Sequence, residues 1–418
     1  MLKTIFQSIF TRGTIAIINL GILVASSRYL GLNSRGEISL FILNIAIIQG
    51  ISEVYTGYGL IRFIPQANLK QLLMSGILFS VFTCSIGNGI LMVLNKQIPG
   101  FEWAGFAISF LVVYNTFNCV LIMGKQKITW YNRMSLVQPI LLLLFLCLSI
   151  FVFKVYTFAA FVYPLFFSFL FATAISAILV NRLSGTEKQE MKKNTLKSIL
   201  SHGFLYQASV LLYIFCNRYS YYLLPDKASL GLYSSATVLS ESVLIIANAL
   251  APILMTTLAN LTDKKEAGSL SAAMAVITFL FCFIGMSLVL CMPESVYTAI
   301  LGKSFTGIQS LMWNYAPAVL LAGFVIVLSS YFTATSNQKM VLFSYGLGFV
   351  SVFVLAPYLI GKYGTVGAAY AANIAFVLVT LILTSLFILH SKAKLSDFMI
   401  VGMANKKIRN LLKQNAIK

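Results

Sequence analysis

Six charged side chains lie inside long apolar segments of this chain, and they are its clearest candidates for chemistry. They are Arg12, Arg28, Glu53, Arg62, Arg218 and Glu241. A charge in hydrocarbon costs about 2.5–3.5 kcal/mol on insertion scales, so such a residue usually faces a partner or a water-filled cavity. Four arginines against two glutamates favour an anionic ligand, because guanidinium matches phosphate through bidentate hydrogen bonds.

Glu53 belongs to a polar stripe inside one apolar segment. Gln49, Glu53 and Gly57 are four residues apart and share one face of a helix. Glu53 lies about 21 Å along that helix from Ser39. A carboxyl group in a low-dielectric site can exchange a proton near neutral pH. We predict that Glu53 is an ion-coupling residue; the alternative is a glutamate paired with an arginine for packing.

A second polar stripe lies in the other half of the chain. Thr237, Glu241 and Asn248 are spaced by four and seven residues, which places them on one helix face. Asn217 and Arg218 end the preceding segment. We predict Glu241 as a second ion-coupling residue, and Asn217, Arg218 and Asn248 as ligands in a cavity. The alternative for Glu241 is a polar cap in the outer half of its helix.

Arg12 and Arg62 complete the predicted cavity ligands. Residues 13–27, between Arg12 and Arg28, span about 22 Å as helix, less than the roughly 30 Å of hydrocarbon. At least one of these two arginines must therefore reach water. Arg12 and Arg62 could also be interfacial anchors, and Arg28 fits a structural role beside Gly31.

The elements that position these residues are transmembrane helices. Of the 418 residues, 59% are hydrophobic and only 10% are charged, far below the quarter that is typical of soluble domains. Apolar segments at 5–30 and 38–64, interrupted by charge, precede ten charge-free stretches long enough to cross a bilayer. The ten are 71–95, 103–124, 134–153, 155–181, 198–217, 242–262, 267–293, 304–338, 340–361 and 363–391. We predict an all-α integral membrane protein with twelve transmembrane helices.

The net charge of +19 reports orientation rather than nucleic-acid binding. With the N-terminus in the cytoplasm, 22 of the 30 basic residues fall in cytoplasmic segments, as the positive-inside rule requires. Both termini are therefore predicted to be cytoplasmic. The basic tail, 391–418, is predicted either to lie on the anionic inner leaflet as an amphipathic helix or to remain floppy.

The segments divide into two sets of six. The loop 181–197 separates a lobe at 1–180 from a lobe at 198–390, and six spans in each favour a parallel repeat. Gly36 can be laid over Gly231, which places Glu53 opposite Asn248. No His/Cys/carboxylate cluster, nucleophile motif or long external loop supports catalysis, a metal or a cofactor, so we predict that the chain is not an enzyme. A polytopic glycan polymerase or glycosyltransferase would need such a loop.

Short motifs recur in a fixed order along the chain. They are Ser27-Arg28-Tyr29-Leu30-Gly31 with Arg35-Gly36, Leu60-Ile61-Arg62-Phe63-Ile64-Pro65, Leu230-Gly231-Leu232-Tyr233-Ser234-Ser235-Ala236, Leu301-Gly302-Lys303-Ser304-Phe305 and Tyr363-Gly364-Thr365-Val366-Gly367-Ala368-Ala369. With them the chain resembles the polysaccharide-biosynthesis (Wzx-type) flippases of the multidrug/oligosaccharidyl-lipid/polysaccharide exporter superfamily. Relatives often have an acidic residue before the basic one where this chain has Asn217-Arg218.

The resemblance implies two six-helix lobes around a central cavity in the bacterial inner membrane. It implies alternating access that moves a polyprenyl-diphosphate-linked oligosaccharide to the outer leaflet for surface polysaccharide biosynthesis (O-antigen, capsule or exopolysaccharide). H⁺ or Na⁺ would be the coupling ion, and a polysaccharide polymerase and chain-length proteins would be partners. The alternative within the superfamily is a cation-coupled multidrug exporter, which the surplus of arginine disfavours.

Overall fold

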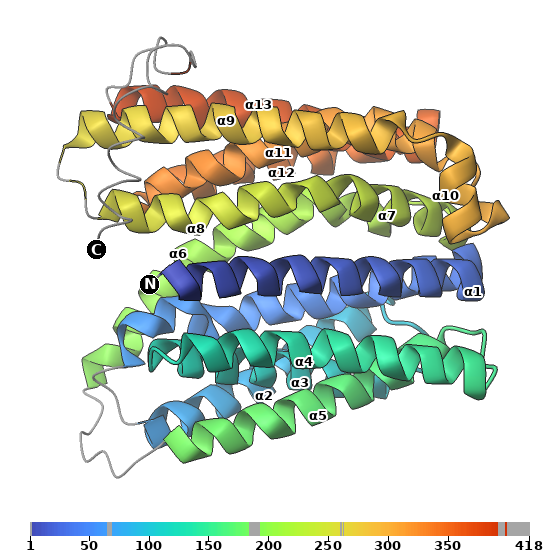
Figure 1. Ribbon diagram of the computed structural model, residues 1–418, viewed down its shortest axis with the longest axis horizontal. Coiled ribbons are helices and arrows are strands. Elements are labelled where there is room, and N and C mark those ends of the chain that lie inside the picture. The colour runs from blue at the N-terminus through green and yellow to red at the C-terminus, as the bar shows by residue number, and fades with distance from the viewer. Residues whose placement is uncertain are drawn as a thin grey trace.

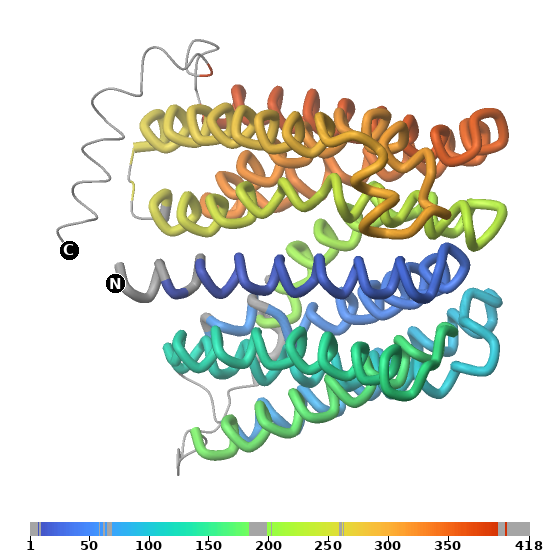
Figure 2. The backbone as a smooth tube through the Cα atoms, turned by 45° about the vertical axis from the view of Figure 1, so that its right-hand side comes forward, coloured from blue at the N-terminus to red at the C-terminus, as the bar shows by residue number. Residues whose placement is uncertain are grey.

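The computed structural model is a bundle of long helices, and it describes residues 2–64, 69–183, 193–259, 261, 263–391 and 398. In these ranges, eleven helical segments are long and apolar enough to cross a membrane. The first, Phe10–Ile61, has 52 residues, and as a straight helix it would be about 78 Å long. It folds back instead at Gly31 (φ 77°, ψ 178°) into two arms, as Figure 2 shows. Counting both arms, the predicted all-α fold with twelve transmembrane helices is confirmed.

The helix bounds follow the apolar segments closely. They are α1 (Leu2–Thr56), α2 (Leu69–Val93), α3 (Glu102–Gly124), α4 (Ile128–Cys147), α5 (Ala159–Leu183), α6 (Lys193–Arg218), α7 (Lys227–Glu241), α8 (Ile245–Ala259), α9 (Lys264–Cys291), α10 (Glu294–Leu301), α11 (Ile308–Ala334), α12 (Gln338–Tyr363) and α13 (Thr365–Ser391). A short 3-10 turn at Ser242–Leu244 joins α7 to α8, so that Lys227–Leu258 forms one span. The charge-free stretch 242–262 covers only part of this span, because Glu241 lies in its middle.

The two arms of α1 lie between two groups of helices (Figure 1). Helices α2–α5 lie on one side of α1 and α7–α13 on the other, and α6 begins beside the first group and crosses to the second. The arms pack against α3 and α4 as well as α6 and α7. Leu23 and Leu43 of α1 join the hydrophobic core of the second group, so α1 connects the two halves. This arrangement is consistent with the predicted two lobes.

The halves touch at a crossing of two glycines near the end of the bundle that carries the Gly31 turn, which the sequence predicts to be the outer end. A Cβ atom on Gly36 would lie 2.0 Å from the Lys227 carbonyl oxygen, and one on Gly231 would lie 2.1 Å from the Leu32 carbonyl oxygen. Only glycine permits such a close approach of two backbones. We name this contact the Gly36–Gly231 crossing.

The crossing has the symmetry of a twofold axis. Gly36 contacts the residue four before Gly231, and Gly231 contacts the residue four before Gly36. Ser39 and Ser234, 195 residues apart like the two glycines, also meet each other, with their hydroxyl oxygens 2.7 Å apart. Equivalent residues contact one another in this reciprocal way only beside a twofold axis. The contact therefore supports the predicted parallel repeat, in which Gly36 was aligned with Gly231.

Candidate functional site

Arg218 is the centre of a buried polar network in the second half, and both ends of its guanidinium are occupied. Its Nη2 forms an ion pair with Glu241, while Nη1 donates to the Tyr221 hydroxyl and, at 2.7 Å, to Thr237 Oγ1. The Tyr221 hydroxyl also lies 2.8 Å from Thr237 Oγ1. The end of α6 and the middle of the α7–α8 span are thereby joined.

Asn217 enters the same network through α11. The Tyr315 hydroxyl lies 2.8 Å from Glu241 Oε1 and 3.1 Å from Asn217 Oδ1, and Asn217 Nδ2 donates to the Tyr213 carbonyl. The structure therefore brings together Asn217, Arg218 and Glu241, three of the seven residues that the sequence singled out. Because Glu241 compensates the charge of Arg218 and Nη1 donates to Tyr221 and Thr237, this guanidinium is engaged within the protein in this conformation.

Glu53 lies between the two halves, and its carboxylate accepts hydrogen bonds from side-chain amides rather than from a basic side chain. Gln49 Nε2 donates to Oε1 at 2.7 Å from the same helix, and Gln207 Nε2 of α6 donates to Oε2 at 2.9 Å. Among the described residues Glu53 has no ion pair. The Gln207 bond links the halves, and in the part of the chain that the structure describes the buried Gln207 Oε1 atom has no hydrogen-bond partner.

Backbone contacts bring α6 close to the Glu53 turn. A Cβ atom on Gly203 would lie 1.9 Å from the Val54 carbonyl oxygen, and one on Gly57 would lie 2.9 Å from Gln207 Nε2. Glycine at both positions lets the Gln207 amide reach the carboxylate. Sequence reasoning found Glu53 and Gln49 by their spacing but could not identify Gln207.

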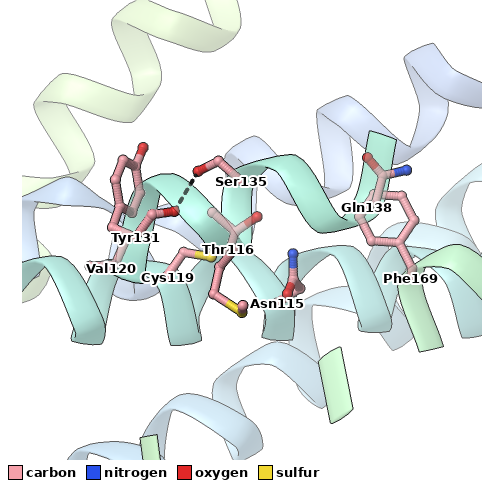
Figure 3. Close-up of a pocket in the computed structure, with 9 residues that line it drawn as sticks. Asn115, Thr116, Cys119, Val120, Tyr131, Ser135, Gln138 and Phe169 are labelled. Atoms are coloured by element: carbon pink, nitrogen blue, oxygen red, sulfur yellow. Dashed lines mark hydrogen bonds between the residues drawn. The ribbon is translucent and has the colours of Figure 1, made fainter. Parts of the chain in front are cut away.

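A small cavity of about 180 Å³ lies between α3, α4 and α5 and connects to Glu53 through hydrogen bonds. It is lined by Asn115, Thr116, Cys119, Val120, Tyr131, Met134, Ser135, Gln138 and Phe169 (Figure 3). Gln49 Nε2 lies 3.4 Å from Thr116 Oγ1, which continues the network from the carboxylate to the cavity wall. The sequence analysis missed this cavity, although Tyr131, Ser135 and Gln138 share one helix face by their spacing.

The remaining predicted ligands lie apart from these networks. Arg12 and Asn248 are exposed, and neither forms a hydrogen bond with a described residue. Arg62 ends the 3-10 turn Tyr58–Arg62, and its side chain lies outside the described part of the structure. The structure therefore does not gather all the predicted arginines at one point.

Arg35 is a charged residue that the sequence analysis noted only as part of a turn motif. It is 6% exposed, and its Nε atom is buried without a hydrogen-bond partner among the described residues. Its position beside Gly36, on the face that contacts α7, was the signal that could have identified it.

One titratable group outside the spans is perturbed by the local fold. The Asp226 carboxylate caps α7 by accepting hydrogen bonds from the Ser229 backbone N–H and hydroxyl, both at 2.7 Å. These bonds favour the ionised carboxylate and lower the pKa of Asp226.

Solved structures of membrane transporters share this fold. The lipid II flippase MurJ, in an inward closed conformation, superposes with a TM-score of 0.69 at 14% identity, covering 96% of this chain and 89% of that chain. A mutant of the Vibrio cholerae MATE transporter VcmN gives 0.63 at 14% identity, covering 92% and 95%. A MOP superfamily transporter from Pyrococcus furiosus gives 0.67 at 12% identity, covering 93% and 96%.

These likenesses establish the fold and no more, because all the identities are low. No family model and no curated protein matches the sequence significantly. The chain thus has the fold of MATE-type and MurJ-type transporters, a multi-pass helical membrane fold.

Proposed function

We propose that this protein moves a polyprenyl-diphosphate-linked oligosaccharide from the cytoplasmic to the outer leaflet of a bacterial inner membrane. The observation that carries the proposal is the excess of arginine over carboxylate on the helices where the halves meet. Helix α1 carries Arg12, Arg28 and Arg35 but only two carboxylates, Glu37 and Glu53, and Glu37 is paired with Lys227. Arg218 of α6 and Glu241 compensate each other. An anionic diphosphate suits this charge balance better than a cationic drug does.

In this proposal the halves move against each other around a central cavity by alternating access. Residues 1–180 and 198–390 form the two lobes, joined by the cytoplasmic loop 181–197, with both termini and the tail 391–418 in the cytoplasm. The reciprocal contact of Gly36 with Gly231 supports two equivalent moving units. Arg12, Arg62 and Asn248 would then contact substrate from the cavity wall.

An ion gradient would drive the cycle through Glu53. This carboxylate has hydrogen bonds but no ion pair among the described residues, and its Gln207 bond crosses the interface between the halves. Protonation would remove its charge and alter this bond as the lobes separate. Glu241 is a weaker candidate because its charge is compensated by Arg218. A polysaccharide polymerase and chain-length proteins would act on the translocated product.

The second candidate is a cation-coupled multidrug exporter, which the uncompensated Glu53 carboxylate favours. Two assays distinguish the functions. Deletion of the gene should trap the lipid-linked glycan in the cytoplasmic leaflet, whereas its accumulation on the outer face would refute the flippase. Proteoliposomes should make the glycan accessible to an external glycosidase, and they should not accumulate ethidium when a proton gradient is imposed.

A further inference from the structure

A side chain of α13 bonds to the backbone of α11 where a proline interrupts that helix. Pro317 lies within α11, where its ring removes the backbone donor for the Trp313 carbonyl oxygen and crowds that carbonyl. Asn373 of α13 reaches the next pair of backbone groups. Its Oδ1 accepts from the Ala318 backbone N–H at 2.9 Å, and its Nδ2 donates to the Asn314 carbonyl oxygen at 2.8 Å. One amide thus bridges residues 314 and 318.

The two bridged groups are the donor and the acceptor of one helical hydrogen bond. In a regular α-helix the Ala318 N–H would bond to the Asn314 carbonyl oxygen, four residues earlier. A proline at 317 bends the helix and weakens this neighbouring bond as well as removing its own. Backbone groups without partners are costly in hydrocarbon, so a neighbouring helix must supply them. An asparagine amide carries a donor and an acceptor side by side and therefore satisfies both groups at once.

The bridged turn, residues 314–318, also carries a tyrosine of the polar network around Glu241. Tyr315 is 1% exposed, and its hydroxyl lies 2.8 Å from Glu241 Oε1 and 3.1 Å from Asn217 Oδ1. Its ring packs edge-on against Tyr233 of α7, with the ring centroids 6.1 Å apart. Because the backbone directs a helical side chain, the bend of α11 at Pro317 decides whether this hydroxyl reaches Glu241.

The corresponding helices of the first half are built differently. In the predicted repeat, α3 and α5 correspond to α11 and α13, as the fourth and sixth spans correspond to the tenth and twelfth. Helix α3 contains no proline, and the Thr173 hydroxyl of α5 donates a single hydrogen bond to the Leu111 carbonyl oxygen of α3. Among the described residues no side chain bridges a turn of α3. The bridge is thus a feature of the half that holds the Arg218–Glu241 ion pair.

We infer that Asn373 is a positioning residue. By bridging the turn at Pro317 it sets the bend of α11, and through this bend it holds the Tyr315 hydroxyl on Glu241. Its described hydrogen bonds go to the α11 backbone alone, so its effect on Glu241 is indirect. The inference concerns the geometry of the network and holds for a lipid-linked glycan or a drug as the substrate.

Equilibrium unfolding of the full-length protein in mixed micelles with SDS tests the bridge. Asn373→Leu keeps the size of the side chain and removes both hydrogen bonds, so it should raise the unfolding equilibrium constant about 10- to 100-fold. In Pro317→Ala the helix regains the bond between residues 318 and 314. The effect of Asn373→Leu should then fall to about twofold or less, which is the scatter of independent sites. Equal effects in the two backgrounds would overturn the inference, because Asn373 would only fill space.

Two control variants show whether the effect is specific to the bridged turn. Pro357→Ala removes a proline from α12 and should leave the effect of Asn373→Leu unchanged. Thr384→Val removes from α13 a buried hydroxyl that has no hydrogen-bond partner within the described ranges, and it should not raise the unfolding constant. Suppression by Pro357→Ala, or a Thr384→Val effect as large as that of Asn373→Leu, would contradict the bridge.

A second cycle distinguishes positioning from support of the helix alone. Tyr315→Phe removes only the hydroxyl and should raise the unfolding constant about 10-fold or more in the wild type, because the lost bond goes to a carboxylate. In Asn373→Leu the same change should have about a twofold effect or less. A Tyr315→Phe effect of the same size in both backgrounds would refute the positioning role.

Recovery of folded protein provides a third measurement. If Asn373→Leu is not recovered as a monodisperse species in detergent, its combination with Pro317→Ala should be, because the helix then satisfies its own backbone groups. Failure of the double variant to fold, when Pro317→Ala alone folds, would also overturn the inference.

Discussion

The Arg218–Glu241 ion pair gives a stability prediction that the geometry fixes in sign and size. Glu241→Gln keeps the shape of the side chain and an oxygen that Tyr315 can reach, but it leaves the Arg218 charge without its anion. Breaking a buried pair on one side costs about 3–5 kcal/mol. Because both side chains are 20% exposed, we expect the lower end, about 3 kcal/mol.

The assay is equilibrium unfolding of the purified protein in mixed micelles with increasing SDS. Arg218→Met should be destabilised by a similar amount, since it leaves the Glu241 carboxylate alone. The double variant should be less destabilised than the sum of the two single changes, because no unpaired charge remains. Lys227→Met, which breaks the exposed pair with Glu37, is the control and should cost less than about 1 kcal/mol.

Additive effects in this double-mutant cycle would refute the reasoning. They would mean that the two charges are each solvated independently and that Arg218 is free to bind a phosphate. A loss of less than about 1 kcal/mol in the free energy of unfolding of Glu241→Gln would lead to the same conclusion, because an ion pair between exposed side chains contributes no more than that.

Three further predictions concern single residues. Gly203→Ala should lower stability by about 1–3 kcal/mol or more, because its Cβ would meet the Val54 carbonyl oxygen, whereas Gly89→Ala, with open space around it, should be neutral in the same SDS assay. Glu53→Gln should abolish the response of glycan transport to a collapsed proton gradient in vesicles; an unchanged response would exclude Glu53 as the coupling group. Asp226→Ala should cost about 1 kcal/mol through loss of the helix cap. The stability that the wild-type cap contributes should be complete above the unfolded pKa of Asp226 and should be lost as the pH falls through its lowered folded pKa. An effect of Asp226→Ala on stability that is the same at low and neutral pH would contradict this prediction.

The sequence alone determined the membrane fold and the local polar stripes. Span length, charge-free stretches and helical spacing depend on residues close together in the chain, so twelve spans followed directly. The pairing of Gln49 with Glu53 followed for the same reason, since residues four apart share a helix face. The alignment of Gly36 with Gly231 could also be predicted, because the helices of an internal repeat carry similar residues at equivalent positions of the sequence.

Only the tertiary structure decided which charges compensate each other. From spacing, Arg218 was one of the predicted phosphate ligands and Arg35 was part of a turn motif. The Arg218 side chain, at the end of α6, reaches Glu241 of α7, and the crossing of α1 over α7 buries Arg35 without an ion pair among the described residues. Gln207, the partner of Glu53, comes from a helix 154 residues away in the chain. Such pairings depend on how helices cross in space, and electrostatic compensation acts over a few ångströms of that space rather than along the sequence.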